Sequence, residues 1–153
     1  MAAFQFRLAR VLRVRQIEED VAKAAWSSAL QAATEADRAV ENTRVVRKRS
    51  QNELAASLAS SQLTPAEVLT RHKTLDALSA DLERRLQQAK TLHFQADQLR
   101  VPWEAKRNEV RGLERLRDKH KEEFHHEERL TESALMDEIA SMRATQRKKV
   151  DHS

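Results

Sequence analysis

Apolar residues recur every seven positions along most of the chain, in two long stretches. In the first stretch the repeat is a row of mostly small side chains, at positions 22, 25, 29, 32, 36, 39, 43 and 46. In the second stretch one phase holds at positions 68, 75, 82, 89, 96, 103, 110, 117 and 124, with Leu78, Leu92, Leu99 and Leu113 at companion positions. A strict repeat of seven predicts α-helices that supercoil around one another as a left-handed coiled coil.

The residues between the two stretches carry the signals of a turn followed by the start of a helix. Thr64 is a favourable N-cap, Pro65 suits the first helical position, and Glu67 completes a capping box with Thr64. Leu63 and Val68 occupy the positions of a hydrophobic staple. We therefore expect the second helix to begin at Pro65.

A turn this short places the two helices antiparallel, so we expect one all-α domain built as a coiled-coil hairpin. The row of alanines allows close approach of the helices and places Trp26 near Leu99. After Val46 the apolar phase of the first helix shifts, and Leu54 and Leu58 continue it to the turn. The expected boundaries are residues 1–153 for the domain, 4–58 for the first helix, 59–64 for the turn and 65–148 for the second helix.

The second helix is expected to be longer than the first and kinked near Pro102, because the proline removes a hydrogen bond while the apolar phase continues past it. Residues after about 125 then extend beyond the paired region. This overhang carries Leu130, Ala134, Leu135, Ile139 and Met142, which recur at helical spacing. An apolar stripe on an unpaired helix predicts a docking surface, or else a terminus that folds back or frays.

Composition narrows the class of protein further. One glycine and two prolines are too few for the many turns of a β-sandwich, a β-barrel or a dinucleotide-binding fold. With no cysteine the chain has no disulfide framework, as is usual in a reducing compartment. No apolar run approaches the roughly 20 residues that a membrane-spanning helix needs.

The polar side chains do not form a recognisable catalytic or metal-binding motif. His120, His125 and His126 lie among glutamates, but their spacing matches no zinc motif. A two-helix hairpin also lacks the enclosed pocket in which a carboxylate acquires a perturbed pKa. We therefore expect no catalytic residue, no metal site and no cofactor.

The charge pattern favours protein partners over nucleic acid. The formal net charge of +4 is small for a nucleic-acid-binding protein. Neither basic cluster runs directly into a leucine repeat, as a basic zipper would require. Binding to nucleic acid or to an anionic membrane is a less favoured alternative. The two clusters are Arg44, Arg47, Lys48 and Arg49, and Arg147, Lys148 and Lys149.

Short stretches at both ends and near the middle of the second helix carry a family resemblance. They are Phe4-Gln-Phe-Arg-Leu-Ala-Arg-Val-Leu-Arg-Val-Arg-Gln-Ile-Glu-Glu, Trp103-Glu-Ala-Lys-Arg, Leu113-Glu-Arg-Leu-Arg and Arg129-Leu-Thr-Glu-Ser-Ala-Leu-Met-Asp-Glu. This pattern resembles the FliJ family, soluble components of the bacterial flagellar type III export apparatus. The chain is also similar in architecture to the related stalk proteins of injectisomes.

The resemblance implies an antiparallel coiled coil, similar to the central stalk of rotary ATP synthases. Its end with both termini would enter a hexameric export ATPase, and its middle and turn would contact the cytoplasmic domain of the export gate. The gate candidates are Val46 and Leu78, in a region with fewer aromatic residues than the family pattern. The residues implied for the ATPase contact are Phe6, Leu8, Val11, Leu12, Arg15, Leu135, Met136, Asp137, Glu138, Ile139 and Arg143.

The predicted function is that of a non-enzymatic adaptor or stalk that also escorts export chaperones. We expect a monomer in the cytoplasm that reaches the inner face of the membrane only through its partners. The alternatives are an injectisome stalk protein, and a structural coiled coil that dimerises through the overhang without an ATPase partner.

Overall fold

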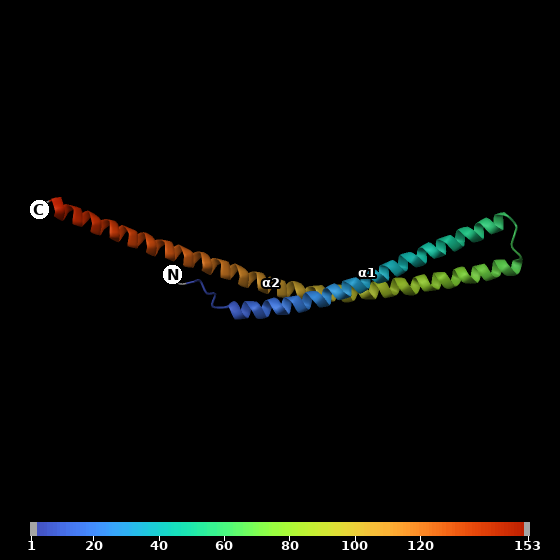
Figure 1. Cartoon of the computed structure of the whole chain (residues 1–153). Coiled ribbons are helices and arrows are strands. Elements are labelled where there is room, and N and C mark those ends of the chain that lie inside the picture. Colours follow the sequence, from blue (N-terminus) through green and yellow to red (C-terminus); the bar gives the residue numbers. More distant parts are fainter. Residues whose placement is uncertain (1–2, 152–153) are drawn as a thin grey trace. The chain divides into compact units, whose positions relative to one another are not determined.

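The computed structural model describes residues 3–151 as two long helices joined by a short turn (Figure 1). Helix α1 is Ala9–Ala59 and helix α2 is Pro65–Asp151, and the described residues contain no strand. The chain divides into two compact units, each containing parts of both helices. The turn unit is Glu18–Lys106, and the terminal unit combines Met1–Ile17 with Arg107–Ser153. The prediction of an all-α helical hairpin is confirmed.

Helix α1 begins later than expected, and residues 3–8 before it are not helical. Apolar Phe4, Phe6 and Leu8 are half-buried, whereas the intervening Gln5 and Arg7 are exposed. The N–H of Ala9 donates to the carbonyl of Phe6 at 3.1 Å, which closes a turn directly before the helix. The helix prediction from residue 4 was therefore wrong by five residues, since α1 begins at Ala9.

Helix α1 ends in a Schellman arrangement. The N–H of Gln62 donates to the carbonyl of Ser57 at 3.3 Å, and the N–H of Ser61 donates to the carbonyl of Leu58 at 3.2 Å. Ser61 has a φ of 54°, in the left-handed region that glycine adopts most easily. The turn therefore forces a residue with a Cβ atom into a conformation that costs about 1–2 kcal/mol.

The start of α2 confirms the capping box. Thr64 Oγ1 accepts a hydrogen bond from the N–H of Glu67, and Glu67 Oε2 accepts one from the N–H of Thr64, both at 3.3 Å. These two bonds satisfy donors that would otherwise lack a partner at a helix start. The helix then continues without interruption through Pro102, as the apolar phase predicts.

The packed face of α1 differs in one row from the predicted face. Residues 22, 29, 36 and 43 face α2 as expected, but their companions lie one position later than predicted. Of the predicted companions, Ala25 and Val46 are exposed and Ala32 and Ala39 are half-buried, whereas Ala33 and Val40, each one position later, are buried. The phase also does not shift after Val46. The buried and half-buried positions of α1 follow one row, with positions 16, 18, 32 and 39 half-buried beside it; the row is 12, 15, 19, 22, 26, 29, 33, 36, 40, 43, 47, 50, 54 and 57.

The reason for this difference is that two alternations fit a period of seven equally well. Both rows contain positions 22, 29, 36 and 43. A companion three residues after each of these gives the predicted alanine row, and a companion four residues after each gives the row with Trp26, Val40 and the aliphatic stem of Arg47. Burial of the larger side chains removes more apolar surface from water, and an arginine stem can cover a core while its head stays wet. The larger side chains therefore occupy the interface.

The main row of the packed face of α2 is as predicted, whereas the companion Leu99 is 37% exposed. None of the nine positions from Val68 to Phe124 is exposed, and Leu82, Ala89, Ala96 and Val110 are buried. In the turn unit, Val40 packs with Leu82 and Ala89, and Ala36 lies against this cluster. This cluster therefore joins side chains of both helices in one apolar contact. Each large aliphatic side chain buried in this way contributes about 1.5–3 kcal/mol.

Contacts across the turn unit give the pairing of the two helices. Lys106 Nζ lies 3.0 Å from Glu18 Oε2, and His93 Nε2 lies 2.8 Å from Asp37 Oδ2. The indole rings of Trp26 and Trp103 stack with centroids 4.8 Å apart and planes 5° apart. The neighbour of Trp26 on α2 is therefore Trp103, which lies about one helical turn after the predicted neighbour Leu99.

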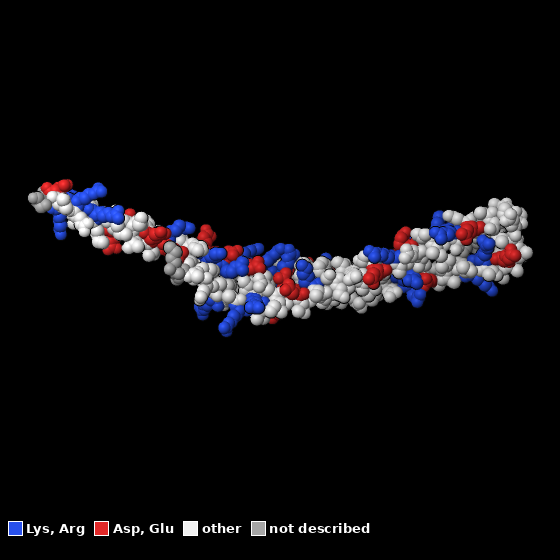
Figure 2. All heavy atoms as spheres, viewed as in Figure 1, with Lys and Arg blue, Asp and Glu red and all other residues white. Residues whose placement is uncertain are grey.

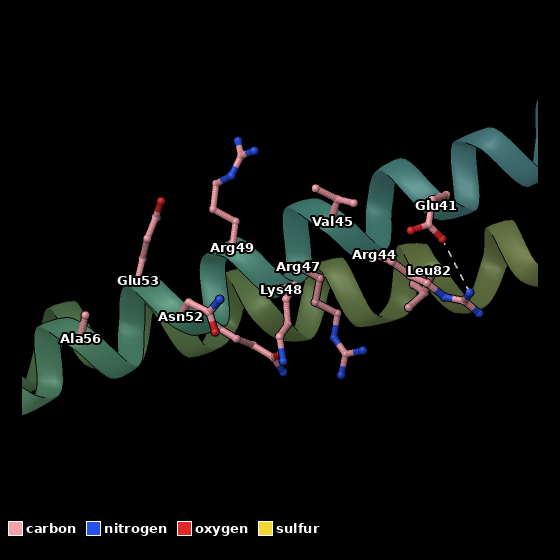
Figure 3. A pocket seen from close by; sticks show the side chains of 11 residues that line it. Glu41, Arg44, Val45, Arg47, Lys48, Arg49, Asn52, Glu53, Ala56 and Leu82 are labelled. Atoms are coloured by element: carbon pink, nitrogen blue, oxygen red, sulfur yellow. Dashed lines mark ion pairs between the residues drawn. The ribbon is translucent and has the colours of Figure 1, made fainter.

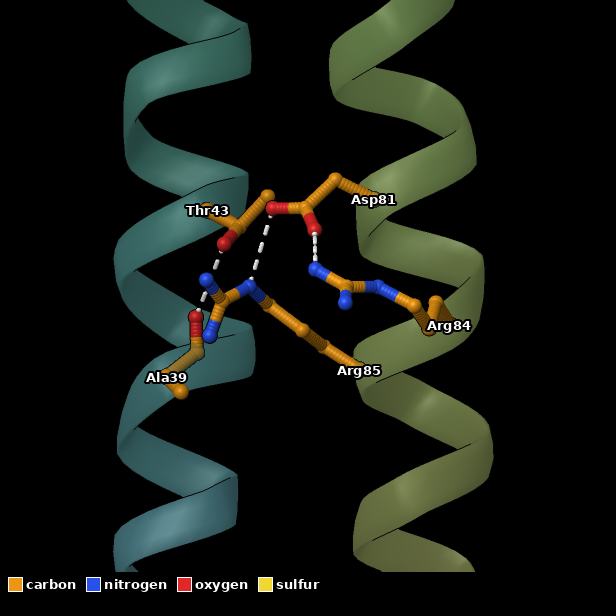
Figure 4. Close-up of polar contacts among 5 residues, drawn as sticks. All are labelled: Ala39, Thr43, Asp81, Arg84 and Arg85. Atoms are coloured by element: carbon orange, nitrogen blue, oxygen red, sulfur yellow. Dashed lines mark hydrogen bonds and ion pairs between the residues drawn. The ribbon is translucent and has the colours of Figure 1, made fainter.

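Two polar side chains of the turn unit, Thr43 and Asp81, are satisfied within their own helices (Figure 4). Thr43 Oγ1 donates to the carbonyl of Ala39 at 2.9 Å, so this buried threonine in the apolar row keeps a hydrogen bond. Asp81 accepts hydrogen bonds from Arg84 and from Arg85 Nε, the latter at 2.9 Å. These two hydrogen bonds hold the pKa of Asp81 below its usual value. On the surface, acidic and basic side chains are interspersed (Figure 2).

Candidate functional site

Helix α2 continues well past its aromatic contacts with the start of the chain. In the terminal unit, the rings of Phe4 and Phe124 have centroids 5.7 Å apart, and Phe6 meets the ring of His120 at 6.0 Å. From residue 129 to residue 151 every side chain is exposed except that of Ile139, which is half-buried. Figure 1 shows this end of α2, coloured orange to red, with no other helix beside it. The predicted overhang is therefore present.

The apolar residues of the overhang form a narrower stripe than the sequence pattern indicated. Leu135, Ile139 and Met142 follow at steps of four and three, so they share one face of the helix. Leu135 is 55% exposed and Met142 is 56% exposed. Leu130 is equally exposed at 57%, but it lies about 140° around the helix from Leu135. We call Leu135, Ile139 and Met142 the tip stripe.

Polar and flexible side chains border the tip stripe. Met136, Glu138 and Arg143 lie at its edges and are exposed, whereas Asp137 is exposed on the opposite side of the helix, about 160° from Ile139. None of these three charged side chains forms an ion pair within residues 3–151. An apolar line flanked by free charges of both signs is typical of a protein-binding surface with a polar rim.

The predicted contact residues near the N-terminus mostly face α2 instead. Leu12 is 5% exposed and belongs to the packed face of α1, so its side chain is not open to a partner. Phe6 and Leu8 are half-buried, and Arg15 Nε lies 3.8 Å from Glu109 Oε2. Of this predicted group, Val11 alone is exposed. The group therefore contributes mainly to the helix pairing within the terminal unit.

Two exposed residues of α1 were missed by the reading of the sequence. Val14 and Ile17 are 53% and 56% exposed and follow Val11 at steps of three. They lie on the side of α1 away from the packed row that contains Leu12 and Arg15. The sequence does contain a signal for these residues, because β-branched apolar residues recur outside the seven-residue repeat. The prediction assigned only one apolar face to this helix, the alanine-rich repeat, and therefore did not include them.

The two predicted groups do not form one compact patch. The N-terminal residues pair with α2 near Phe124, and Leu135 follows Phe124 by eleven residues. At the rise of an α-helix this places the tip stripe about 16 Å further along α2. A partner that contacts both groups must therefore surround the terminal unit over at least this length of α2.

The structure does bring the two gate candidates together in the turn unit. Val46 and Leu78 line the same shallow hollow of about 250 Å³, together with Asn42 and Arg85. Val46 is exposed because it lies beside the packed row of α1, not in it. An exposed valine next to a half-buried leucine gives this hollow an apolar floor.

Other kinds of site find little support in the described chain. Within residues 3–151, no three histidine, aspartate or glutamate side chains gather closely enough to hold a metal ion. The helices that the structure describes contain no segment long and apolar enough to cross a membrane. The candidate site is therefore the apolar and charged surface of the overhang.

Comparison with known proteins agrees with the resemblance seen in the sequence. The family model described as flagellar FliJ protein matches residues 4–149, nearly the whole chain. Searches of the curated proteins and of the solved structures found no match. The family match spans the turn, both packed faces and the overhang with its tip stripe. The chain therefore belongs to the FliJ family, whose members are structural components of the flagellar export apparatus and not a known family of enzymes.

Proposed function

We propose that this chain is a non-enzymatic adaptor of the flagellar type III export apparatus whose terminal unit binds the hexameric export ATPase. The tip stripe carries this proposal, because Leu135 and Met142 are more than half exposed and half-buried Ile139 lies between them on the same face. Burial of one such side chain in a partner contributes about 1.5–3 kcal/mol. Glu138 and Arg143, at the edges of the stripe, would form the polar rim of this contact, and Asp137 would meet a partner only on the opposite side of the helix.

The mechanism we propose is differential binding within a ring. A hairpin has no sixfold symmetry, so it cannot contact six identical subunits equally. It would bind some subunit conformations more tightly than others and thereby shift their populations. The chain itself would need no catalytic group for this role.

The turn unit would serve the other partners in this proposal. The hollow beside Val46 and Leu78 is the proposed contact with the cytoplasmic domain of the export gate. The protein would escort export chaperones as a cytoplasmic monomer and would reach the inner face of the membrane through these partners only. The flagellar family match favours this assignment over that of an injectisome stalk.

Capture of the purified export ATPase by the immobilised chain tests the tip stripe. We expect Leu135→Asp with Ile139→Asp to weaken capture by about a hundredfold, because two buried aliphatic contacts are lost. The matched control is Leu130→Asp, which has the same chemistry and equal exposure but lies on another face. Normal capture by the double variant, or an equal loss in the control, would refute this site.

Sedimentation separates this proposal from the structural alternative. An adaptor that inserts into the ATPase is expected to sediment as a monomer on its own. A coiled coil that buries the tip stripe against a second copy would sediment as a dimer, and Leu135→Asp with Ile139→Asp would convert that dimer to a monomer. A stable dimer of the unaltered chain would therefore favour the alternative.

A further inference from the structure

A second surface of the molecule, in the turn unit, is cationic. A hollow of about 830 Å³ runs along α1 between Glu41 and Ala56 (Figure 3). Arg44, Arg47 and Lys48 project to the side of α1 on which α2 lies, and Arg49 projects away from it. We call the part of the hollow lined by Arg44, Arg47 and Lys48 the basic groove.

The positive charge of the basic groove is poorly neutralised by the protein. Residues 44–52 contain no acidic residue. Arg44 has only a 3.9 Å contact with Glu41, and both side chains are more than half exposed, so this pair is weak. Arg47 and Lys48 form no ion pair in the part of the chain that the structure describes.

Arg47 adds an independent sign of an unfilled site. Its Nε atom is buried and has no hydrogen-bond partner among the described residues. A buried donor on a charged group is strongly unfavourable unless an acceptor is supplied. On α2, the carboxylate of Asp81 does not supply it, because Asp81 is engaged with Arg84 and Arg85. Because Nε itself is buried, an acceptor from outside the chain would pair with Arg47 through the outer nitrogens of its guanidinium, which form no ion pair in the described part of the chain.

The size and lining of the basic groove restrict the kind of anion. Glu41 and Glu53 border it, about 18 Å apart along the helix, and would repel a polyanion that continues past either end. The lining also includes apolar Val45, Ala56 and Leu82. A ligand that matches the groove therefore combines a few closely spaced carboxylates with an apolar side chain.

We propose that the basic groove binds a short acidic, amphipathic segment of a partner protein. Its aspartate or glutamate side chains would pair with Arg44, Arg47 and Lys48, and an apolar side chain would lie against Val45. Nucleic acid and anionic membranes fit less well, because both present extended negative charge without an apolar face. The proposal does not depend on ATPase binding by the tip stripe.

Fluorescence anisotropy with a labelled helical peptide of about 20 residues, carrying one leucine stripe flanked by glutamates, tests the groove. We expect the full chain to bind this peptide but not a version with glutamine in place of glutamate. Arg44→Gln with Lys48→Gln should weaken binding by about tenfold, because two charge pairs are lost at an exposed site. Both residues are exposed, so the variant is expected to stay folded, as circular dichroism would verify.

The charge-matched control is Arg147→Gln with Lys148→Gln, which removes two positive charges from the end of α2 and should leave peptide binding unchanged. An equal loss in this control, or no binding of the acidic peptide, would overturn the proposal. Tighter binding of a short DNA duplex or of phosphatidylserine vesicles would also overturn it. Leu135→Asp with Ile139→Asp should not affect peptide binding, so failure of one site can be distinguished from failure of the other.

Discussion

Two valines on the same helix offer a direct test of the helix pairing. Val40 is 6% exposed and packs with Leu82 and Ala89, whereas Val46 is 46% exposed beside the packed row. Each can be changed to alanine, so the chemical change and the loss of volume are identical. Only the surroundings of the two side chains differ.

The expected magnitudes follow from burial. Valine to alanine removes two methyl groups, which at Val40 costs about 1.6 kcal/mol of transfer free energy plus a cavity contribution. At both sites the better helix propensity of alanine restores about 0.5 kcal/mol. We therefore expect Val40→Ala to lower the free energy of unfolding by about 1–2 kcal/mol. Val46→Ala should leave it unchanged or raise it by up to about 0.5 kcal/mol.

Urea denaturation followed by far-ultraviolet circular dichroism measures both effects in parallel. The slope of the free energy against urea should stay the same for both variants, so that midpoints can be compared. Equal destabilisation by the two substitutions would refute the pairing described here. A larger loss at Val46 would favour the row of alanines that the sequence pattern suggested.

Three further substitutions test the turn and the polar network near it. Ser61→Gly should stabilise the protein by about 1 kcal/mol, because glycine adopts the positive φ without a Cβ penalty, and a lower urea midpoint would contradict this. Thr64→Ala should destabilise it by about 1 kcal/mol through loss of the capping box, with Thr64→Ser as a control that keeps the cap. Asp81→Asn should lower stability near neutral pH, and its effect should shrink as the pH falls through the folded pKa of Asp81, as urea denaturation over an acid pH series would show. The lowered pKa of Asp81 makes its pairing with Arg84 and Arg85 stabilising above the unfolded pKa, and this contribution is lost as the pH falls through the folded pKa. A constant difference between Asp81→Asn and the unaltered chain across this range would contradict the role of the ionised carboxylate.

Features that depend on local chemistry were predictable from the sequence. The capping box needs only Thr64 and Glu67 three residues apart, and Pro65 is compatible with that position in any surroundings. The packed face of α2 was equally clear, because large residues such as Leu82 and Val110 leave no competing phase. Such signals act within one or two helical turns.

The candidate site was predictable in part. Exposure of Leu135, Ile139 and Met142 follows from the unequal lengths of the two helices, which the position of the turn already implies. The role of Leu12 did not follow, because an apolar residue near a terminus can face either a partner or its own neighbouring helix. Its burial became visible only with α2 packed beside it.

By itself the sequence determined that the chain forms two helices, where the second one starts, which face of it is packed, and that it extends past the first. Only the tertiary structure decided which alternation of α1 packs, that Phe4 and Phe6 lie before the helix with their rings against α2, and that Arg47 keeps a buried donor without a partner among the described residues. The physical reason is that a repeat of seven and a local cap are properties of one segment. The choice between two equally periodic faces depends on the side chains that the other helix presents.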